Sequence, residues 1–279
     1  MTQTTPPDLD ELQAFAIELA LEAGALQLEG LSTRPQVEHK SKKELVTPVD
    51  RACEERIVAR IRARFPDHGI LAEEGHQAPG ACRWIIDPID GTSNFAARIP
   101  LFCVSIGIEV EGDPAVGVVY APYLDELFYG RRGGGAFFRR GTAEARPLTV
   151  SRTARLEDAI LATGFAYVQD ETPNHNLDNW VAVKRRARAL RRMGSAALDL
   201  AYVADGRFDG FWELHLKPYD VAAGAVLVRE AGGRVTDFLL GGDWLHGQHI
   251  LATNGAIHQE LHGALAPVRP DPWVRLPPA

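Results

Sequence analysis

The chain has 279 residues, of which 46% are hydrophobic and 24% charged, a composition typical of a globular protein with a large core. A formal net charge of −7, with no block of Lys and Arg interleaved with aromatic residues, argues against nucleic-acid binding. The N-terminus lacks a signal-peptide pattern, no apolar run reaches the ~20 residues of a membrane span, and three scattered cysteines argue against disulfides. We therefore expect a cytoplasmic protein that binds neither nucleic acid nor membrane.

Helical patterns open the chain. Apolar residues at steps of three or four predict an amphipathic helix over residues 8–30. A second helix is predicted from Thr47, which stands at the N-cap, with Pro48 in the first helical position and Asp50 in the first turn. A short strand over residues 69–71 follows, and the loop after it carries an acidic pair.

The rest of the chain mixes strands with helices. Residues 102–129 indicate an antiparallel meander, with strands near 102–110, 115–120 and 126–129. Further strands are predicted near 159–163, 208–212, 233–237 and 249–252, and helices near 176–190, 194–205, 218–231 and 255–265. This mixture favours stacked layers of helix and sheet. We expect one domain over residues 9–265, with α/β halves at 9–145 and 146–265, and a Pro-rich tail over 266–279.

The most informative motif is Asp-Pro-Ile-Asp-Gly-Thr at residues 87–92. It follows the apolar run of residues 84–86, which predicts a buried strand, and it precedes side chains suited to start a helix. The helix N-terminus offers N–H groups to an anion, while Asp87 and Asp90 offer carboxylates to a hard cation. Such a pair alone is more often a turn or a cap. Together with an anion site, it indicates metal-assisted phosphate chemistry.

Three more acids occupy comparable positions. Glu73 lies in the loop after a strand, and Asp50 and Asp220 each lie in the first turn of a predicted helix. Singly, Glu73 is typical of an exposed loop acid, and Asp50 and Asp220 are typical of helix caps. Their combined presence, with Thr92 directly after the central motif, favours a shared site.

Several segments together resemble the inositol monophosphatase family of the bacterial inositol-1-monophosphatase type. This family lies within the fructose-bisphosphatase-like superfamily of metal-dependent phosphatases. The matching segments are residues 45–50, 73–75, 84–95, 194–200 and 219–224, and the resemblance spans about residues 9–265. It implies an α+β fold with a layered αβαβα sandwich. It also implies Mg²⁺-dependent hydrolysis of a small phosphate monoester by a lithium-sensitive homodimer.

The resemblance assigns roles to individual residues. It implies two or three Mg²⁺ ions, with Mn²⁺ as a substitute, held by Glu73, Asp87, the Ile89 carbonyl, Asp90 and Asp220. Asp87 would bridge two of the ions. The catalytic residues would be Asp50, Thr92 and Glu73, with Thr92 orienting the attacking water, and the N–H groups of Gly91 and Thr92 would bind phosphate. Substrate contacts would come from Asp90, Gly194, Ser195, Ala196, Glu213 and Asp220.

The sequence is compatible with several phosphate monoesters as the substrate. Inositol 1-phosphate is the leading expectation, but residues 96–98 depart from the usual family pattern close to the site. Residues 217–220 are similar to those of histidinol-phosphate phosphatases of the same superfamily. The alternatives are therefore histidinol phosphate, fructose 1,6-bisphosphate and a nucleotide 3′-phosphate such as 3′-phosphoadenosine 5′-phosphate or NADP. A non-catalytic regulator that senses metal or phosphate is a different class of hypothesis, and the intact set of acids argues against it.

Overall fold

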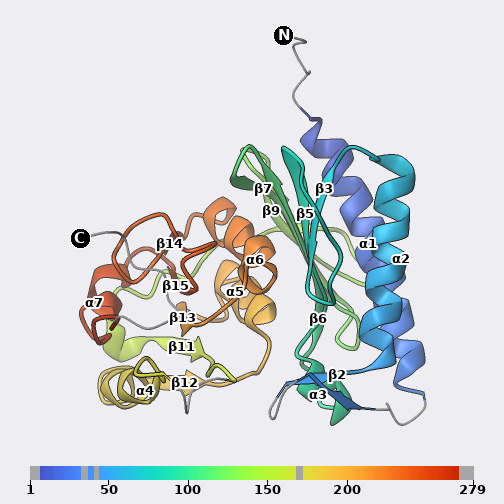
Figure 1. The fold of residues 1–279 in the computed structure, drawn as a ribbon. Helices are drawn as coiled ribbons and strands as arrows, with labels where there is room; N and C mark the ends of the chain where they lie inside the picture. The colour runs from blue at the N-terminus through green and yellow to red at the C-terminus, as the bar shows by residue number, and fades with distance from the viewer. Residues whose placement is uncertain (1–6, 33–36, 41–43, 168–171, 270–279) are drawn as a thin grey trace.

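The computed structural model describes residues 7–32, 37–40, 44–167 and 172–269. Five layers follow one another across the molecule (Figure 1). From one side to the other they are helices α1 (Leu9–Gly30) and α2 (Pro48–Arg64), an eight-stranded sheet, helices α5 (Ala196–Ala204) and α6 (Pro218–Glu230), a five-stranded sheet, and helices α4 (Leu177–Lys184) and α7 (His258–His262). The predicted α+β fold with an αβαβα sandwich is thus confirmed. None of the described helices is long and apolar enough to cross a bilayer.

The large sheet is mostly antiparallel, and its strand order is not the order of the strands in the chain. The order is β10 (Arg146–Pro147), β9 (Gly135–Arg140), β8 (Glu126–Arg131), β7 (Asp113–Ala121), β6 (Cys103–Val110), β5 (Cys82–Asp90), β3 (Gly69–Ala72) and β4 (Gln77–Ala78). Only β3 and β5 pair in parallel within this sheet. Their C-terminal ends therefore lie at the same edge, where Glu73 and the central motif begin.

The second sheet is mixed. Its order is β12 (Ala189–Arg191), β11 (Ile160–Thr163), β13 (Gly210–Leu214), β15 (His249–Thr253) and β14 (Arg234–Thr236), with β11 parallel to both of its neighbours. The remaining elements are the small hairpin of β1 (Glu38–His39) and β2 (Leu45–Val46), the short helix α3 (Thr92–Ala96), and a 3₁₀ turn (Leu156–Asp158).

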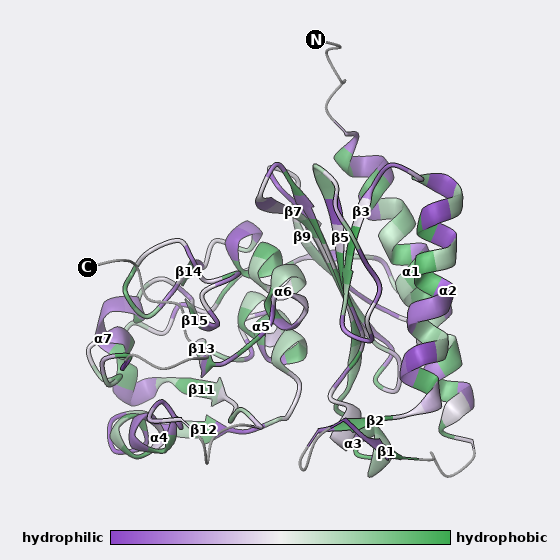
Figure 2. Ribbon diagram, in the orientation of Figure 1, coloured by the Kyte–Doolittle hydropathy of each residue, from purple (hydrophilic) through white to green (hydrophobic). Residues whose placement is uncertain are grey.

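Hydrophobic patterning explains the layers. Helices α1 and α2 show hydrophilic residues on their outer side, whereas α5 and α6 are largely hydrophobic because they lie between the two sheets (Figure 2). Helix α2 begins as predicted, with the Thr47 hydroxyl accepting from Val49 N–H and the Asp50 carboxylate accepting from Thr47 N–H. The three cysteines are free, as expected, and all three are buried.

Helix α6 lies unusually close to the large sheet. A Cβ atom at Gly107 on β6 would lie 2.6 Å from the Ala222 Cβ atom, and one at Gly117 on β7 would overlap the backbone of Ala223. These two strand positions therefore accept only glycine at the present helix–sheet distance. Because Asp220 lies in the first turn of α6, this contact also fixes how near Asp220 comes to β5.

Several predicted boundaries are wrong. The helix expected over 176–190 ends at Lys184, because residues 189–191 instead add an edge strand beside β11. The helix expected over 255–265 contains only His258–His262. Strands β4, β9 and β10 were not predicted. The start of the tail is anchored, since Ala266 N–H donates to Asn179 and Arg269 N–H donates to Asn174. Residues 270–279 lie outside the described residues.

Candidate active site

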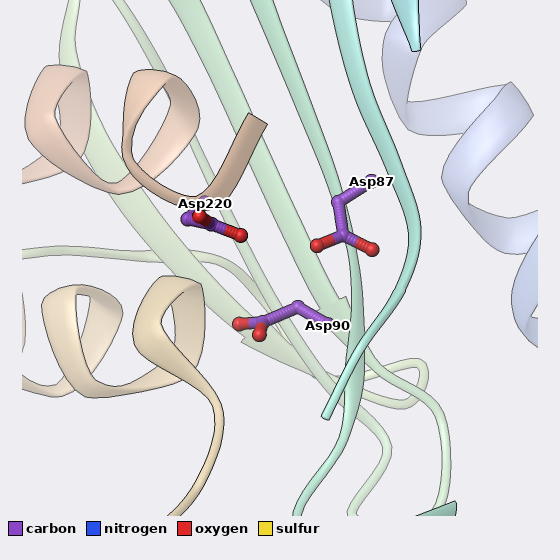
Figure 3. Close-up of side chains that lie close together, drawn as sticks. All are labelled: Asp87, Asp90 and Asp220. Carbon is purple, nitrogen blue, oxygen red and sulfur yellow. The ribbon is translucent and has the colours of Figure 1, made fainter. Parts of the chain in front are cut away.

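Three carboxylates converge where β5 ends and α6 begins. Asp87 and Asp90 come from β5 and Asp220 from the first turn of α6, and one oxygen of each lies within 4.8 Å of the others (Figure 3). Residues three apart on a regular strand would point to opposite faces. Here Asp87 pairs with Ser105 and Asp90 with Cys103, so the two β5 residues between them face a single β6 residue. This extra residue is a bulge, and it lets both carboxylates point to the same side.

Two hydrogen bonds hold the bulge in place, one within β5 and one from α1. Ile89 N–H donates to Asp87 Oδ1 at 3.0 Å, and the buried Gln27 side chain of α1 donates to the Pro88 carbonyl at 2.7 Å. The strand therefore continues to Asp90 rather than ending before the motif as expected. Gln27 was missed by sequence reasoning, because nothing in its local pattern separates it from the apolar positions of the same helix face.

Asp90 is oriented by the start of α5. Its Oδ2 accepts hydrogen bonds from the Ser195 hydroxyl and from Ala197 N–H, each at 2.7 Å. Asp220 is oriented within its own helix, because its Oδ2 accepts from Lys217 N–H at 2.6 Å. The predicted helix start at Pro218 is thus confirmed.

Repulsion dominates the electrostatics of this cluster. Burial raises the pKa of Asp87 well above its usual value, and the negative charges of Glu73, Asp90 and Asp220 raise it further. Burial and the charge of Asp90 likewise raise the pKa of Asp220. Several buried carboxylates at such short range are stable in ionised form only with a cation among them. The all-oxygen donor set fits a hard divalent ion.

Glu73 lines the same pocket but lies outside the three-carboxylate cluster. Lys40, which sequence reasoning missed, places its ammonium 3.1 Å from Glu73 Oε1. Burial raises the pKa of Glu73 to about 7, although the Lys40 charge opposes this rise. The loop is anchored by the buried Glu54, which accepts from Glu74 N–H at 2.6 Å and lies 2.7 Å from the His76 ring.

Thr92 and Asp50 form a buried pair behind the pocket wall. The Thr92 hydroxyl lies 3.1 Å from Asp50 Oδ1 and 3.0 Å from the Ile89 carbonyl. Burial raises the pKa of Asp50, and its hydrogen bonds from Thr47 and Thr92 lower it. The helix expected after the motif is the short α3, and its N-cap is Gly91 at φ +95° with no side-chain cap. Thr92 is the first residue of this helix, and its hydroxyl is engaged with Asp50 and the Ile89 carbonyl.

One pocket of about 320 Å³ unites the predicted site. Every predicted site residue lines it except Asp50, which lies behind Thr92. The predicted lining residues are Glu73, Asp87, Ile89, Asp90, Gly91, Thr92, Gly194, Ser195, Ala196, Glu213 and Asp220. The pocket also contains residues to which sequence reasoning gave no role, among them Tyr167, Arg192, Asp199 and Tyr219. Asp199 lies inside the matching segment of residues 194–200, and Arg192 lies just before it.

A layered αβαβα fold with converging carboxylates at a strand end defines a metal-dependent phosphatase. The chain belongs to the inositol monophosphatase family, whose sequence profile matches residues 8–271. It is 44% identical to the inositol-1-monophosphatase of Synechocystis over 94% of this chain and 91% of that protein. It is 40% identical to a Pseudomonas aeruginosa protein named Nus factor SuhB, over 92% of this chain and 96% of that one.

Solved structures agree with this assignment. The inositol monophosphatase of Anabaena superposes with a TM-score of 0.84 at 43% identity, covering 92% of this chain and 96% of that one. The extragenic suppressor protein suhB of Bartonella henselae also gives a TM-score of 0.84, at 39% identity over 91% of this chain and 98% of that one. The expected family and the expected phosphatase activity are therefore confirmed.

Proposed function

We propose that this phosphatase hydrolyses a small polyol phosphate, with inositol 1-phosphate as the leading substrate, to the alcohol and inorganic phosphate. The observation that carries the proposal is the convergence of Asp87, Asp90 and Asp220 in one pocket. Glu213 lines the same pocket. The site thus combines a cation centre with a group suited to accept hydrogen bonds from hydroxyls.

The ions are two or three Mg²⁺, for which Mn²⁺ can substitute. Glu73, Asp87, the Ile89 carbonyl, Asp90 and Asp220 would hold them, and the hard oxygen donors present fit this assignment. When bound, Mg²⁺ supplies activation of water and neutralisation of charge on the phosphate and on the leaving oxygen. This also relieves the repulsion that raises the pKa of Asp87 and Asp220.

The chain's own residues position the reactants. Thr92 is the group that orients the attacking water, because its hydroxyl is fixed by Asp50 at 3.1 Å. Asp50 accepts a proton through that hydroxyl, and Glu73 acts from the loop after β3 as a further acceptor. The N–H groups of Gly91 and Thr92 would bind the phosphate oxygens.

Substrate contacts come from the start of α5 and from β13. Gly194, Ser195 and Ala196 line the pocket beside Asp90, and Glu213 lines it with only 8% of its surface exposed. Burial raises the pKa of Glu213 to about 8, and the nearby Arg192 charge lowers it. A ligand hydroxyl that donates to Glu213 favours the ionised form in the same way.

A panel of phosphate monoesters tests this proposal. Phosphate release with Mg²⁺ is compared for inositol 1-phosphate, histidinol phosphate, fructose 1,6-bisphosphate, 3′-phosphoadenosine 5′-phosphate and NADP. We expect the highest kcat/KM for inositol 1-phosphate. A higher value for any of the other four would replace the proposed substrate with that compound.

A second candidate function is a regulator that binds metal or phosphate without hydrolysing an ester. It is supported by the name Nus factor, which several relatives carry. The same assay separates the two, because a regulator would release no phosphate from any of these esters with Mg²⁺. We also propose that the protein is cytoplasmic and that it binds neither nucleic acid nor membrane.

We also propose a homodimer and a single catalytic domain over residues 9–265. Support for the dimer comes from α4, where Leu177 and Val181 lie one turn apart with 53% and 48% of their surfaces exposed. Light scattering of Leu177→Asp should then show a shift from dimer towards monomer relative to the unmodified chain. A monomer already in the unmodified chain would refute the dimer.

A further inference from the structure

Asp199 is a buried acid that the proposed reaction does not use. It lies on α5, one turn beyond Ser195, and it lines the pocket with only 1% of its surface exposed. Its Oδ1 atom is buried and has no hydrogen-bond partner among the residues that the structure describes. A buried polar atom left in this state costs roughly 1–3 kcal/mol. In a pocket, such an atom is best explained by a ligand that supplies the missing hydrogen bond.

Charged residues that line the same pocket act on Asp199. Burial raises its pKa well above the usual value, the negative charges of Glu213 and Asp90 raise it further, and the positive charge of Arg192 lowers it. The charges of Asp90 and Glu213, which line the same pocket, thus both act on Asp199.

Glu213 and Arg192 line the same pocket as Asp199. A Cβ atom at Gly164 would overlap the Glu213 carboxylate, so Glu213 cannot retreat towards that loop. The Arg192 guanidinium is packed against Gly194, where a Cβ atom would lie 2.6 Å from Arg192 Nη1. Within the described part of the chain, neither the Glu213 carboxylate nor the Arg192 guanidinium forms a hydrogen bond or ion pair. Glu213, Arg192 and the Oδ1 atom of Asp199 thus line one pocket with no hydrogen-bond partner among the described residues.

We propose that Asp199 is a specificity-determining residue that acts with Glu213 to bind adjacent hydroxyl groups of an uncharged polyol. This inference rests on the proposed function and specifies the leaving group as an uncharged polyol. A hydroxyl can donate to either carboxylate, and a carboxyl group that keeps its proton can donate to a hydroxyl oxygen. A second phosphate on the substrate would instead meet two acids and a single guanidinium, which disfavours bisphosphates.

Asp199→Asn tests the inference at nearly constant side-chain volume. We expect KM for inositol 1-phosphate to rise about tenfold, because one charge-assisted hydrogen bond is weakened. The kcat for p-nitrophenyl phosphate, which has no hydroxyl to bind, should change far less. Asp67→Asn, at an exposed turn position, is the matched control. An unchanged KM for inositol 1-phosphate, or an equal loss on both esters, would overturn the inference.

Arg192→Gln provides an independent variant whose exposed side chain can be changed without opening a cavity. Removing the guanidinium leaves two acids, so kcat/KM for fructose 1,6-bisphosphate should fall at least about tenfold relative to that for inositol 1-phosphate. An unchanged ratio would count against the inference. An unmodified enzyme that hydrolyses p-nitrophenyl phosphate but no polyol phosphate would refute the proposed function itself. An active enzyme whose Asp199→Asn and Arg192→Gln variants keep the original substrate ratios would refute only this inference.

Discussion

Ser195 donates a 2.7 Å hydrogen bond to Asp90, although the two residues lie 105 positions apart in the chain. The bond joins the start of α5 to the end of β5, so it ties the central helix layer to the large sheet at a carboxylate proposed to bind a cation. A hydrogen bond to a charged group contributes roughly 1.5–3 kcal/mol. The orientation of Asp90 therefore depends on a contact that only the folded chain creates.

Removing Ser195's hydroxyl should weaken cation binding without destroying the site. In Ser195→Ala, we expect the Mg²⁺ concentration for half-maximal activity to rise about tenfold, an effect of about 1.4 kcal/mol.

Asp90→Asn removes an anionic ligand itself, so it should cut kcat by about 10²-fold or more while the fold is retained. Mg²⁺ titrations of steady-state phosphate release measure both effects. A folded Asp90→Asn enzyme with nearly unchanged kcat at saturating Mg²⁺ would contradict the proposed metal site.

Thr92→Val removes a hydroxyl at constant shape. Because this hydroxyl is proposed to orient water with the help of Asp50, we expect kcat to fall by about 10²-fold or more with little change in KM. Thr142→Val, at an exposed turn position, serves as the control. Retention of more than about half of the original kcat would exclude Thr92 from the proton-transfer step.

Glu213→Gln tests recognition of the polyol. Loss of the charged acceptor should raise KM for inositol 1-phosphate by about tenfold, or ~1.4 kcal/mol. The cation ligands and Thr92 are unaltered, so p-nitrophenyl phosphate should be hydrolysed at nearly the original rate. Parallel losses on the two esters would show that Glu213 supports the structure of the site and does not contact the polyol.

Lithium should inhibit the enzyme. Li⁺ is small and hard enough to occupy an oxygen cage such as that of Asp90 and Asp220, but its single charge cannot fully replace Mg²⁺. Initial rates measured against substrate at several Li⁺ concentrations should show uncompetitive or noncompetitive inhibition. Full activity at high-millimolar Li⁺ would argue strongly against a cation site built from these two residues.

The stability of the metal-free protein should decrease as the pH rises. Burial raises the pKa of Glu73 to about 7 and that of Glu213 to about 8, above the ordinary value of 4.5 for both. Between these values the folded chain binds more protons than the unfolded chain, so the free energy of unfolding falls from about pH 5 to about pH 8. Urea unfolding in EDTA at about pH 6 and about pH 8.5 measures the difference.

Added Mg²⁺ should reverse this trend, because a bound cation stabilises the ionised carboxylates and stabilises the fold more at the higher pH. A metal-free protein that is equally stable at both pH values would show that these acids are not held at raised pKa. Mg²⁺ that stabilises the protein equally at both values would show that it does not bind these acids.

Local patterns were sufficient to locate much of the site. The apolar run before Asp87, the turn residues around Asp90, and the helix starts at Thr47 and Lys217 each act within a few residues. Helix starts depend on short-range hydrogen bonds, and these are visible in the sequence. The family resemblance then indicated that such local features belong to one site, which spacing alone does not.

Contacts between distant segments could not be predicted in this way. Gln27 reaches the Pro88 carbonyl from 61 positions away, and Lys40 reaches Glu73 from 33 positions away. Arg192 follows an edge strand whose residues have no strand pattern of their own and pair only because β11 is beside them. Each of these placements is decided by tertiary packing, which overrides local propensity.

The close contact of α6 with Gly107 and Gly117 has a consequence for how this enzyme tolerates mutation. Any larger residue at either position would push the helix, and with it Asp220, away from β5. A genetic screen for enzymes that demand more magnesium would therefore recover substitutions in the middle of β6 and β7. Those alleles would look like ordinary core defects in the sequence, yet growth on excess magnesium should rescue them.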